Sequence, residues 1–314
     1  MAGGGGAAQD AQRKAFFEPT AKALGIKINE ATVNFIQEVR LQVQSGAVSW
    51  DIVELGADDC AVGSKEGLWE PLDFNIVKTD GIDPKLVGKD WVGYFYYSTV
   101  LAWNTGTVPQ GMNTWADFFN VDKFPGERGV YNYPRGNLEM ALLADGVEPS
   151  KLYPLDVDRA FKKLAELKPH VGVWWESGAQ SAQLIKDGSV DMLEIWNGRV
   201  NAVIKDGAAA KYTFNQGILN ADCIAIPKGS KHKDLAMKAL AMFISPELQA
   251  RFPLYIDYGP INSKAFETGV LTQEQIDANL ASPKNIRNQV IVDSDWWAKN
   301  MAAMTERWNN FRQE

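Results

Sequence analysis

The chain has 314 residues, of which 46% are hydrophobic and 23% are charged. This is the composition of a globular protein with material for buried cores, so disorder over the bulk of the chain is excluded, and the length suggests two domains. Lys and Arg number 32 against 39 Asp and Glu, a formal charge of −7, which argues against a nucleic-acid-binding protein.

The amino-terminal segment predicts a loop followed by a helix. Met1 precedes glycines 3–6 instead of a charged and apolar leader, so no signal peptide is expected. A helix is predicted from Gln9 to a stop at Gly25, and its opening from glycines suggests that a short or missing strand precedes it. The run lacks the features of a phosphate loop or a dinucleotide fingerprint. A flexible loop is favoured, although bare amides could receive an anion.

Further along, strands and helices alternate, which predicts α/β layers with largely parallel sheets. The expected strands are residues 50–55, 92–103, 129–131, 171–175, 191–196 and 222–226. The expected helices are residues 57–65, one from 114, 137–144, 158–167, one after Ser177, 234–243 and 294–311. No apolar run approaches the roughly 18 to 20 residues of a membrane-spanning helix, so the chain is expected to be soluble.

Cysteine and histidine are too few for most catalytic chemistry. The two histidines and two cysteines form no metal-ligand spacing, so no metal and no cofactor is expected. Cys60 follows two aspartates, which would raise the pKa of its thiol and disfavour a nucleophile. The spacing of Cys60 and Cys223 fixes neither a disulfide nor a compartment, and two free thiols are the favoured interpretation. Nucleophilic catalysis is therefore poorly supported and we expect no enzyme, although an acid/base pair of carboxylates stays open.

Three segments carry a family resemblance. They are DMLEIWNGR at 191–199, NADCIAIPKG at 220–229 and YIDYGPIN at 255–262. Their order and spacing resemble the extracellular solute-binding proteins of bacterial ABC importers, in particular the spermidine/putrescine-binding branch. The resemblance extends from about Gln9 to the carboxyl terminus.

The resemblance implies an α/β, two-lobed periplasmic-binding-protein fold of type II, with a ligand cleft between lobes that are joined by hinge crossovers. Lobe one would comprise residues 1–103 and 223–314, and lobe two residues 104–222. The implied task is capture of a small molecule in the periplasm, as a monomer, and its delivery to an inner-membrane ABC permease.

The ligand positions differ from those of polyamine binders. Asp222 matches the aspartate that receives an ammonium there, and Trp196 matches a tryptophan lining the cleft. The acidic pair for the far end of a polyamine falls at Tyr133 and Gly136, and Arg199 follows Trp196 closely. An arginine repels a polyamine but can take a carboxylate bidentately. The pattern therefore indicates a zwitterion such as γ-aminobutyrate (GABA), for which a branch of this family is known.

The expected ligand contacts are Arg199, Asp222, Trp196, Tyr97, Tyr258, Tyr133 and Asp58. Trp196, Tyr97 or Tyr258 would add cation–π contact with the ammonium, whereas Asp58, at a helix start, also suits a capping role. Three alternatives stay open at this point: a polyamine binder in which Arg199 faces outward, an α/β enzyme acting on amino compounds, and a carbohydrate binder that uses the tryptophans.

Overall fold

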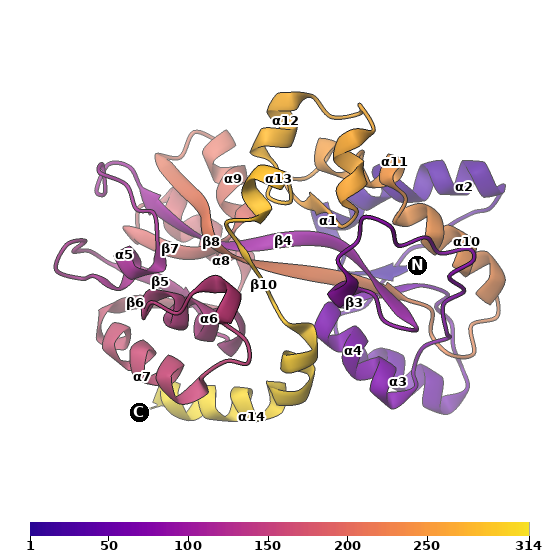
Figure 1. The fold of residues 1–314 in the computed structure, drawn as a ribbon, viewed down its shortest axis with the longest axis horizontal. Coiled ribbons are helices and arrows are strands. Elements are labelled where there is room, and N and C mark those ends of the chain that lie inside the picture. Colours follow the sequence, from indigo (N-terminus) through magenta and orange to yellow (C-terminus); the bar gives the residue numbers. More distant parts are fainter. Residues whose placement is uncertain (314) are drawn as a thin grey trace. The chain divides into compact units, whose positions relative to one another are not determined.

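The computed structural model describes residues 1–313, which fold into two compact units. Unit 1 comprises residues 1–96, 221–283 and 293–298, and unit 2 comprises residues 97–220, 284–292 and the chain from Lys299 onward. Two long strands belong to both units, β4 (Trp91–Asn104) and β8 (Ala210–Ala225) (Figure 1). None of the helices within these residues has the length and apolar character needed to span a membrane.

Unit 1 contains short strands that pair in both parallel and antiparallel directions. Its short strands are β1 (Ala2–Gly3), β2 (Ala31–Thr32), β3 (Val53–Gly56) and β9 (Gly259–Pro260). Its helices are α1 (Gly6–Gln12), α2 (Glu18–Leu24), α3 (Ile36–Ser45), α4 (Ala57–Glu66), α10 (Lys233–Phe243), α11 (Pro246–Gln249) and α12 (Gln273–Ala278). Strand β1 is parallel to β2 and β3, whereas β3 is antiparallel to β8. The predicted short strand before the first helix is therefore present.

The glycine run is not one loop: Gly3 ends β1, Gly6 begins α1, and only Gly4 and Gly5 connect the two elements. Gly3 belongs to β1, and the amide of Gly5 donates a hydrogen bond of 3.0 Å to the side-chain oxygen of Gln9. A Cβ on Gly3 would lie 2.8 Å from a carboxyl oxygen of buried Glu54. Burial raises the pKa of Glu54 to about 7. The glycine is thus required by a close approach of backbone to a buried carboxyl.

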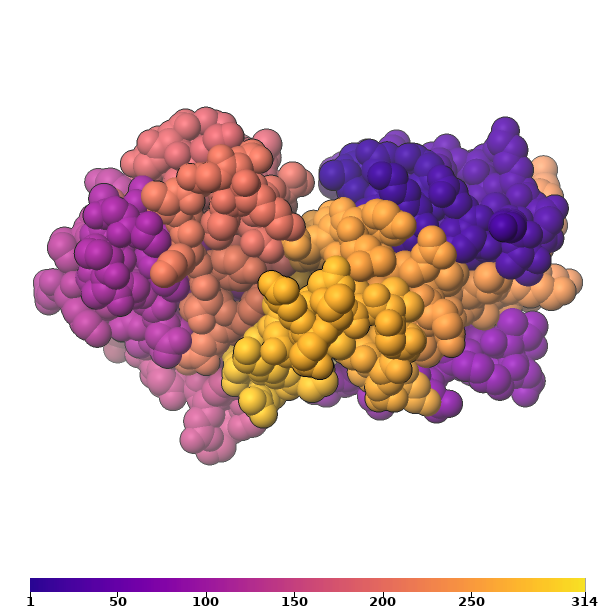
Figure 2. All heavy atoms as spheres, turned by 90° about the horizontal axis from the view of Figure 1, so that it is seen from above, coloured from indigo at the N-terminus to yellow at the C-terminus, as the bar shows by residue number. Residues whose placement is uncertain are grey.

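The first helical segment extends further than predicted. Helix α1 begins at Gly6, continues through a π-helical stretch at Arg13–Phe17 and ends in α2, where Gly25 adopts a left-handed φ of 64°. The Phe16 ring lies 5.0 Å from that of Phe252 between centroids. Figure 2 shows the corresponding segments of unit 1, indigo and orange, side by side.

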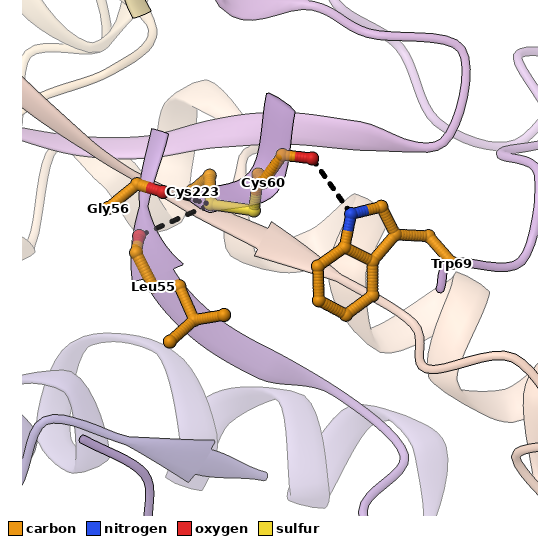
Figure 3. Close-up of a disulfide and its surroundings, with 5 residues drawn as sticks. All are labelled: Leu55, Gly56, Cys60, Trp69 and Cys223. Carbon is orange, nitrogen blue, oxygen red and sulfur yellow. Dashed lines mark hydrogen bonds between the residues drawn. A yellow bond between two sulfur atoms is a disulfide. The ribbon is translucent and has the colours of Figure 1, made fainter. Parts of the chain in front are cut away.

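Cys60 and Cys223 form a disulfide, with Cα atoms 6.4 Å apart, which corrects the expectation of free thiols. The cause is tertiary: β3 pairs with β8 so that Leu55 lies opposite Cys223, and α4 begins directly after β3. Cys60, in the first turns of α4, is thereby brought to the strand that carries Cys223. Beside it, Trp69 Nε1 donates a hydrogen bond of 2.9 Å to the Cys60 carbonyl oxygen (Figure 3).

Unit 2 has its own core of helices on a mixed sheet. Its strands, besides its parts of β4 and β8, are β5 (Arg128–Tyr131), β6 (Val171–Trp175), β7 (Met192–Trp196) and β10 (Val290–Ile291). Its helices are α5 (Trp115–Phe119), α6 (Pro134–Ala144), α7 (Val157–Leu167), α8 (Gly178–Lys186) and α9 (Asn197–Lys205). Helices α13 (Pro283–Ile286) and α14 (Ser294–Gln313) carry residues of both units.

The sheet of unit 2 is only partly parallel. Strand β5 is parallel to β6 and β7, and β10 is parallel to β8, but β7 is antiparallel to β4. The prediction of largely parallel strands is therefore right for the outer strands and wrong for the long strand β4. Apolar side chains of β4, β7, α8 and α9 form the core next to the predicted ligand residues, with Val100, Ile195, Ile185 and Val200 at most 2% exposed.

We expect the disulfide to contribute strongly to stability because it closes a loop of 163 residues. Cys60→Ala combined with Cys223→Ala should lower the free energy of unfolding by about 2 to 5 kcal/mol, mainly because the unfolded chain regains conformational freedom. Urea unfolding measures this loss. Reductant should lower the melting temperature of the wild-type protein and leave that of the double variant unchanged; equal responses of the two proteins would contradict the prediction.

Candidate functional site

Trp196, the last residue of β7, is held by three aromatic rings. Tyr97, Tyr131 and Trp175 contact it edge-on at centroid distances of 6.4, 5.4 and 5.2 Å. Trp175 is fully buried and donates a hydrogen bond of 2.9 Å to the carbonyl oxygen of Glu194. Because edge-to-face contacts on several sides fix a ring, Trp196 presents one defined, partly exposed surface. Among the residues numbered 94 to 97, Tyr97 alone is partly exposed.

Arg199 is in the first turn of α9, and the start of that helix is hydrogen-bonded to β4. Buried Asn197 accepts a hydrogen bond of 2.9 Å from the amide of Ser98. The Arg199 side chain is exposed and, within the described part of the chain, has no ion-pair partner. Both Arg199 and Trp196 lie against Gly178, the first residue of α8: a Cβ there would be 2.6 Å from Arg199 Nε. Unit 2 therefore places a guanidinium beside an aromatic surface.

A second partly exposed segment of unit 2 extends this aromatic surface. The Tyr131 and Tyr133 rings are 5.6 Å apart between centroids, and the Arg135 guanidinium lies 5.9 Å from the centre of the Tyr133 ring. Tyr133 Oη donates a hydrogen bond of 3.1 Å to the sulfur of Met301. Tyr131, Tyr133 and Trp196 thus form what we call the aromatic strip, with Arg199 near one end and Arg135 near the other.

Two buried carboxyls that the sequence analysis missed accept hydrogen bonds from the backbone around Tyr131 and Tyr133. Glu194 accepts a hydrogen bond of 2.8 Å from the amide of Tyr131, and Glu139 accepts one of 2.9 Å from the amide of Gly136. The Tyr153 hydroxyl donates to Glu139. Burial, together with the charge of Glu139, raises the pKa of Glu194 to about 8. The only available signal was a Glu inside the apolar strand at 191–196, since a buried acid needs partners.

The remaining predicted contacts belong to unit 1. Asp222 lies opposite Gly56 in the β3–β8 ladder, next to the disulfide-bonded Cys223, and Asp58 is in the first turn of α4. Both aspartates are partly exposed. The Tyr258 ring stacks on Phe95 with centroids 5.4 Å apart and 7° between the planes. The disulfide therefore ties the strand of Asp222 to the helix of Asp58.

The predicted residues divide by charge between the units. Unit 1 brings together Asp222 and Asp58 and carries Tyr258, whereas unit 2 carries Tyr97, Tyr133, Trp196 and Arg199. Trp175 and Trp297 are fully buried, whereas Trp174 and Trp296 are partly exposed. No cluster of three or more His, Cys, Asp or Glu side chains within residues 1–313 could hold a metal ion.

Glu194 makes the stability of the chain depend on pH. Its carboxyl stays protonated in the folded state up to a pKa of about 8, whereas its ordinary value is 4.5. The folded state therefore loses stability as pH rises from 5 to 8, because the unfolded chain releases this proton first. Glu194→Gln keeps a neutral group, so its unfolding free energy relative to wild type should rise by about 3 to 4 kcal/mol over that range.

Urea unfolding at pH 5 and pH 8 measures this difference. Glu166→Gln, at an exposed position of α7, is the control and should follow the wild type at both pH values. If Glu194→Gln loses as much stability as the wild type between the two pH values, Glu194 is ionised in the folded state and the prediction is wrong.

Comparison with known proteins identifies the family. Residues 14–279 match the family model of the bacterial extracellular solute-binding proteins. The gamma-aminobutyric acid-binding protein of Pseudomonas aeruginosa is 33% identical over 97% of this chain and 88% of its own length. This family acts in the periplasm or outside the cell.

Solved structures of binding proteins also resemble this chain over nearly its whole length. An ABC transporter substrate-binding protein of Bradyrhizobium japonicum USDA 110 is 46% identical, with a TM-score of 0.95 over 99% of this chain and 98% of its own. MotA of A. tumefaciens B6, solved with glucopine, is 42% identical, with a TM-score of 0.87 over 99% and 98% of the two chains. The Atu4243 GABA receptor is 36% identical, with a TM-score of 0.90 over 99% and 96%.

These likenesses confirm the predicted α/β fold of two-lobed binding proteins and the prediction that the chain is no enzyme. Proteins of this class bind a small molecule and deliver it to a permease. The chain therefore belongs to the bacterial extracellular solute-binding proteins, as the substrate-binding subunit of an ABC importer.

Proposed function

We propose that this subunit captures GABA or a similar small ω-amino acid. The observation that carries the proposal is the position of the Arg199 guanidinium. It is exposed, it forms no ion pair among residues 1–313, and it lies beside Trp196, whose ring is packed against other aromatic rings. In this proposal Arg199 binds the ligand carboxylate with two parallel hydrogen bonds. Asp222 of unit 1 binds the ammonium, with Trp196, Tyr97, Tyr258, Tyr133 and Asp58 as further contacts.

The charges present oppose a polyamine. A polyamine carries an ammonium at each end, and each buried ammonium needs a carboxylate or aromatic partner because its desolvation costs several kcal/mol. The positions of the polyamine-binding acidic pair are Tyr133 and Gly136. The nearby carboxyls of Glu139 and Glu194 are buried and bonded to backbone amides, whereas the Arg135 and Arg199 guanidiniums lie beside the aromatic rings. The GABA-binding relative and the GABA receptor support the same choice, since both resemble this chain over nearly its whole length.

A second ligand class is favoured by Arg135 and by the likeness to the glucopine-bound MotA. A guanidinium near each end of the aromatic strip suits a longer ligand with a second anionic or hydrogen-bond-accepting group. The identity to MotA, 42%, exceeds that to the GABA receptor, 36%. Glucopine is therefore the comparison ligand that tests the size of the accepted molecule.

We further propose that units 1 and 2 are the two lobes of the binding protein, and that the chain acts as a monomer in the periplasm with an inner-membrane ABC permease as its partner. The disulfide supports the location, because disulfides persist in oxidising compartments such as the periplasm. The residues 96/97 and 220/221, where β4 and β8 pass between units, would then act as the hinge positions.

A calorimetric titration with three ligands tests the proposal. GABA should bind with one-to-one stoichiometry, whereas putrescine should release no binding heat at the same concentrations, because Arg199 repels its ammonium. Heat with putrescine and none with GABA would replace the proposed ligand by a polyamine. Heat with glucopine alone would favour the longer ligand, and turnover of any of the three would contradict a binding protein.

Arg199→Ala should weaken GABA binding by about 2 to 5 kcal/mol, since truncation leaves the ligand carboxylate desolvated without its partner. The matched control is Lys205→Ala, which removes an exposed cation from the last turn of the same helix and should leave the dissociation constant within about twofold of wild type. Calorimetry measures both. An Arg199→Ala protein that binds GABA as tightly as the wild type removes Arg199 from the site.

A further inference from the structure

Gly178 lacks a side chain at the place where Arg199 and Trp196 lie. A Cβ on this residue would be 2.6 Å from Arg199 Nε and 3.0 Å from the nearest atom of the Trp196 ring. Both distances are shorter than ordinary van der Waals contact, so a methyl group on residue 178 requires a clear shift of Arg199 and a smaller one at the Trp196 ring. The start of α8 is capped independently of this space, because the Ser177 hydroxyl accepts a hydrogen bond from the amide of Gln180.

The backbone at this position does not itself require glycine. Gly178 is the first residue of a regular α-helix, and it is absent from the glycines of positive φ. Alanine is a better helix former than glycine, so the folded state loses nothing in backbone conformation by the exchange. Glycine at this position therefore provides space for the neighbouring side chains and is not needed for the backbone conformation.

Of the two neighbours, Arg199 is the one free to move. The Trp196 ring is confined by Tyr97, Tyr131 and Trp175, all between 5.2 and 6.4 Å away between centroids. The Arg199 side chain is exposed and long, and no ion pair within the described residues holds it. A methyl group at position 178 therefore displaces the guanidinium, whereas the contact with the Trp196 ring requires a shift of only a few tenths of an ångström.

We propose that Gly178 is a positioning residue that sets the selectivity of this subunit for carboxylate-bearing ligands, by leaving the space in which the Arg199 guanidinium rests next to Trp196. The inference rests on the proposed function, in which Arg199 binds the ligand carboxylate. Two parallel hydrogen bonds to a carboxylate need a defined guanidinium orientation, so a displacement of about one ångström is expected to cost substantial affinity.

Gly178→Ala should weaken GABA binding at least about tenfold in calorimetry, while the melting temperature without ligand stays equal to that of the wild type or rises, as for a favourable Gly→Ala exchange in a helix. Gly4→Ala is the matched control, because its Cβ would meet only a Glu54 carboxyl oxygen at 3.8 Å, an ordinary contact. It should bind GABA like the wild type.

A double-mutant cycle separates positioning from a general effect on the pocket. Arg199→Lys keeps a cation without the planar fork, so adding Gly178→Ala to it should change the GABA dissociation constant less than about threefold. An equal tenfold loss in both backgrounds, or a Gly178→Ala protein that binds GABA like the wild type, overturns the role of Gly178. A wild-type protein that binds no GABA overturns the proposed function and this inference with it.

Discussion

The pairing of β3 with β8 is the constraint on which unit 1 depends. It sets Gly56 opposite Asp222 and Leu55 opposite Cys223, and it allows α4 to deliver Cys60 to the same strand. The acidic residues of unit 1 are consequently fixed by a backbone ladder and a covalent bond rather than by a loop. Residues built on strands and helices keep their geometry better than residues on loops.

In unit 2, the predicted ligand residue Trp196 and its neighbour Tyr131 are held in place by aromatic rings and a buried carboxyl. Trp196 is confined by three rings, and the amide of Tyr131 is bound by Glu194 in the core. Burying an acid costs free energy unless it is protonated and hydrogen-bonded. A pKa of about 8 keeps Glu194 neutral over most of the physiological range. Unit 1 has a parallel arrangement, in which buried Glu54 lies under the backbone of Gly3.

The division of charge explains why family membership leaves the ligand open. Relatives that bind GABA and relatives that bind spermidine or putrescine both resemble this chain, and the residues that we propose for the choice between these ligands, Arg199, Arg135 and Gly178, are all on unit 2. Unit 2 presents guanidiniums and aromatic rings, and unit 1 presents Asp222 and Asp58. Selectivity between ligands of the same size then depends on the charge at each end of the ligand and on the charge of the protein group that it meets.

Local patterns in the sequence were sufficient for most elements, because hydrophobic periodicity and caps act over a few residues. Helix 158–167, with its buried apolar stripe, and the Thr114 cap agree closely with α7 and α5. The polar first half of β8 was missed, since Lys211, Asn215 and Gln216 carry no strand signal. The disulfide, the place of the glycine run between β1 and α1, the Glu194 network and the space at Gly178 were decided by the tertiary structure alone, because each depends on which distant strands and helices pack together.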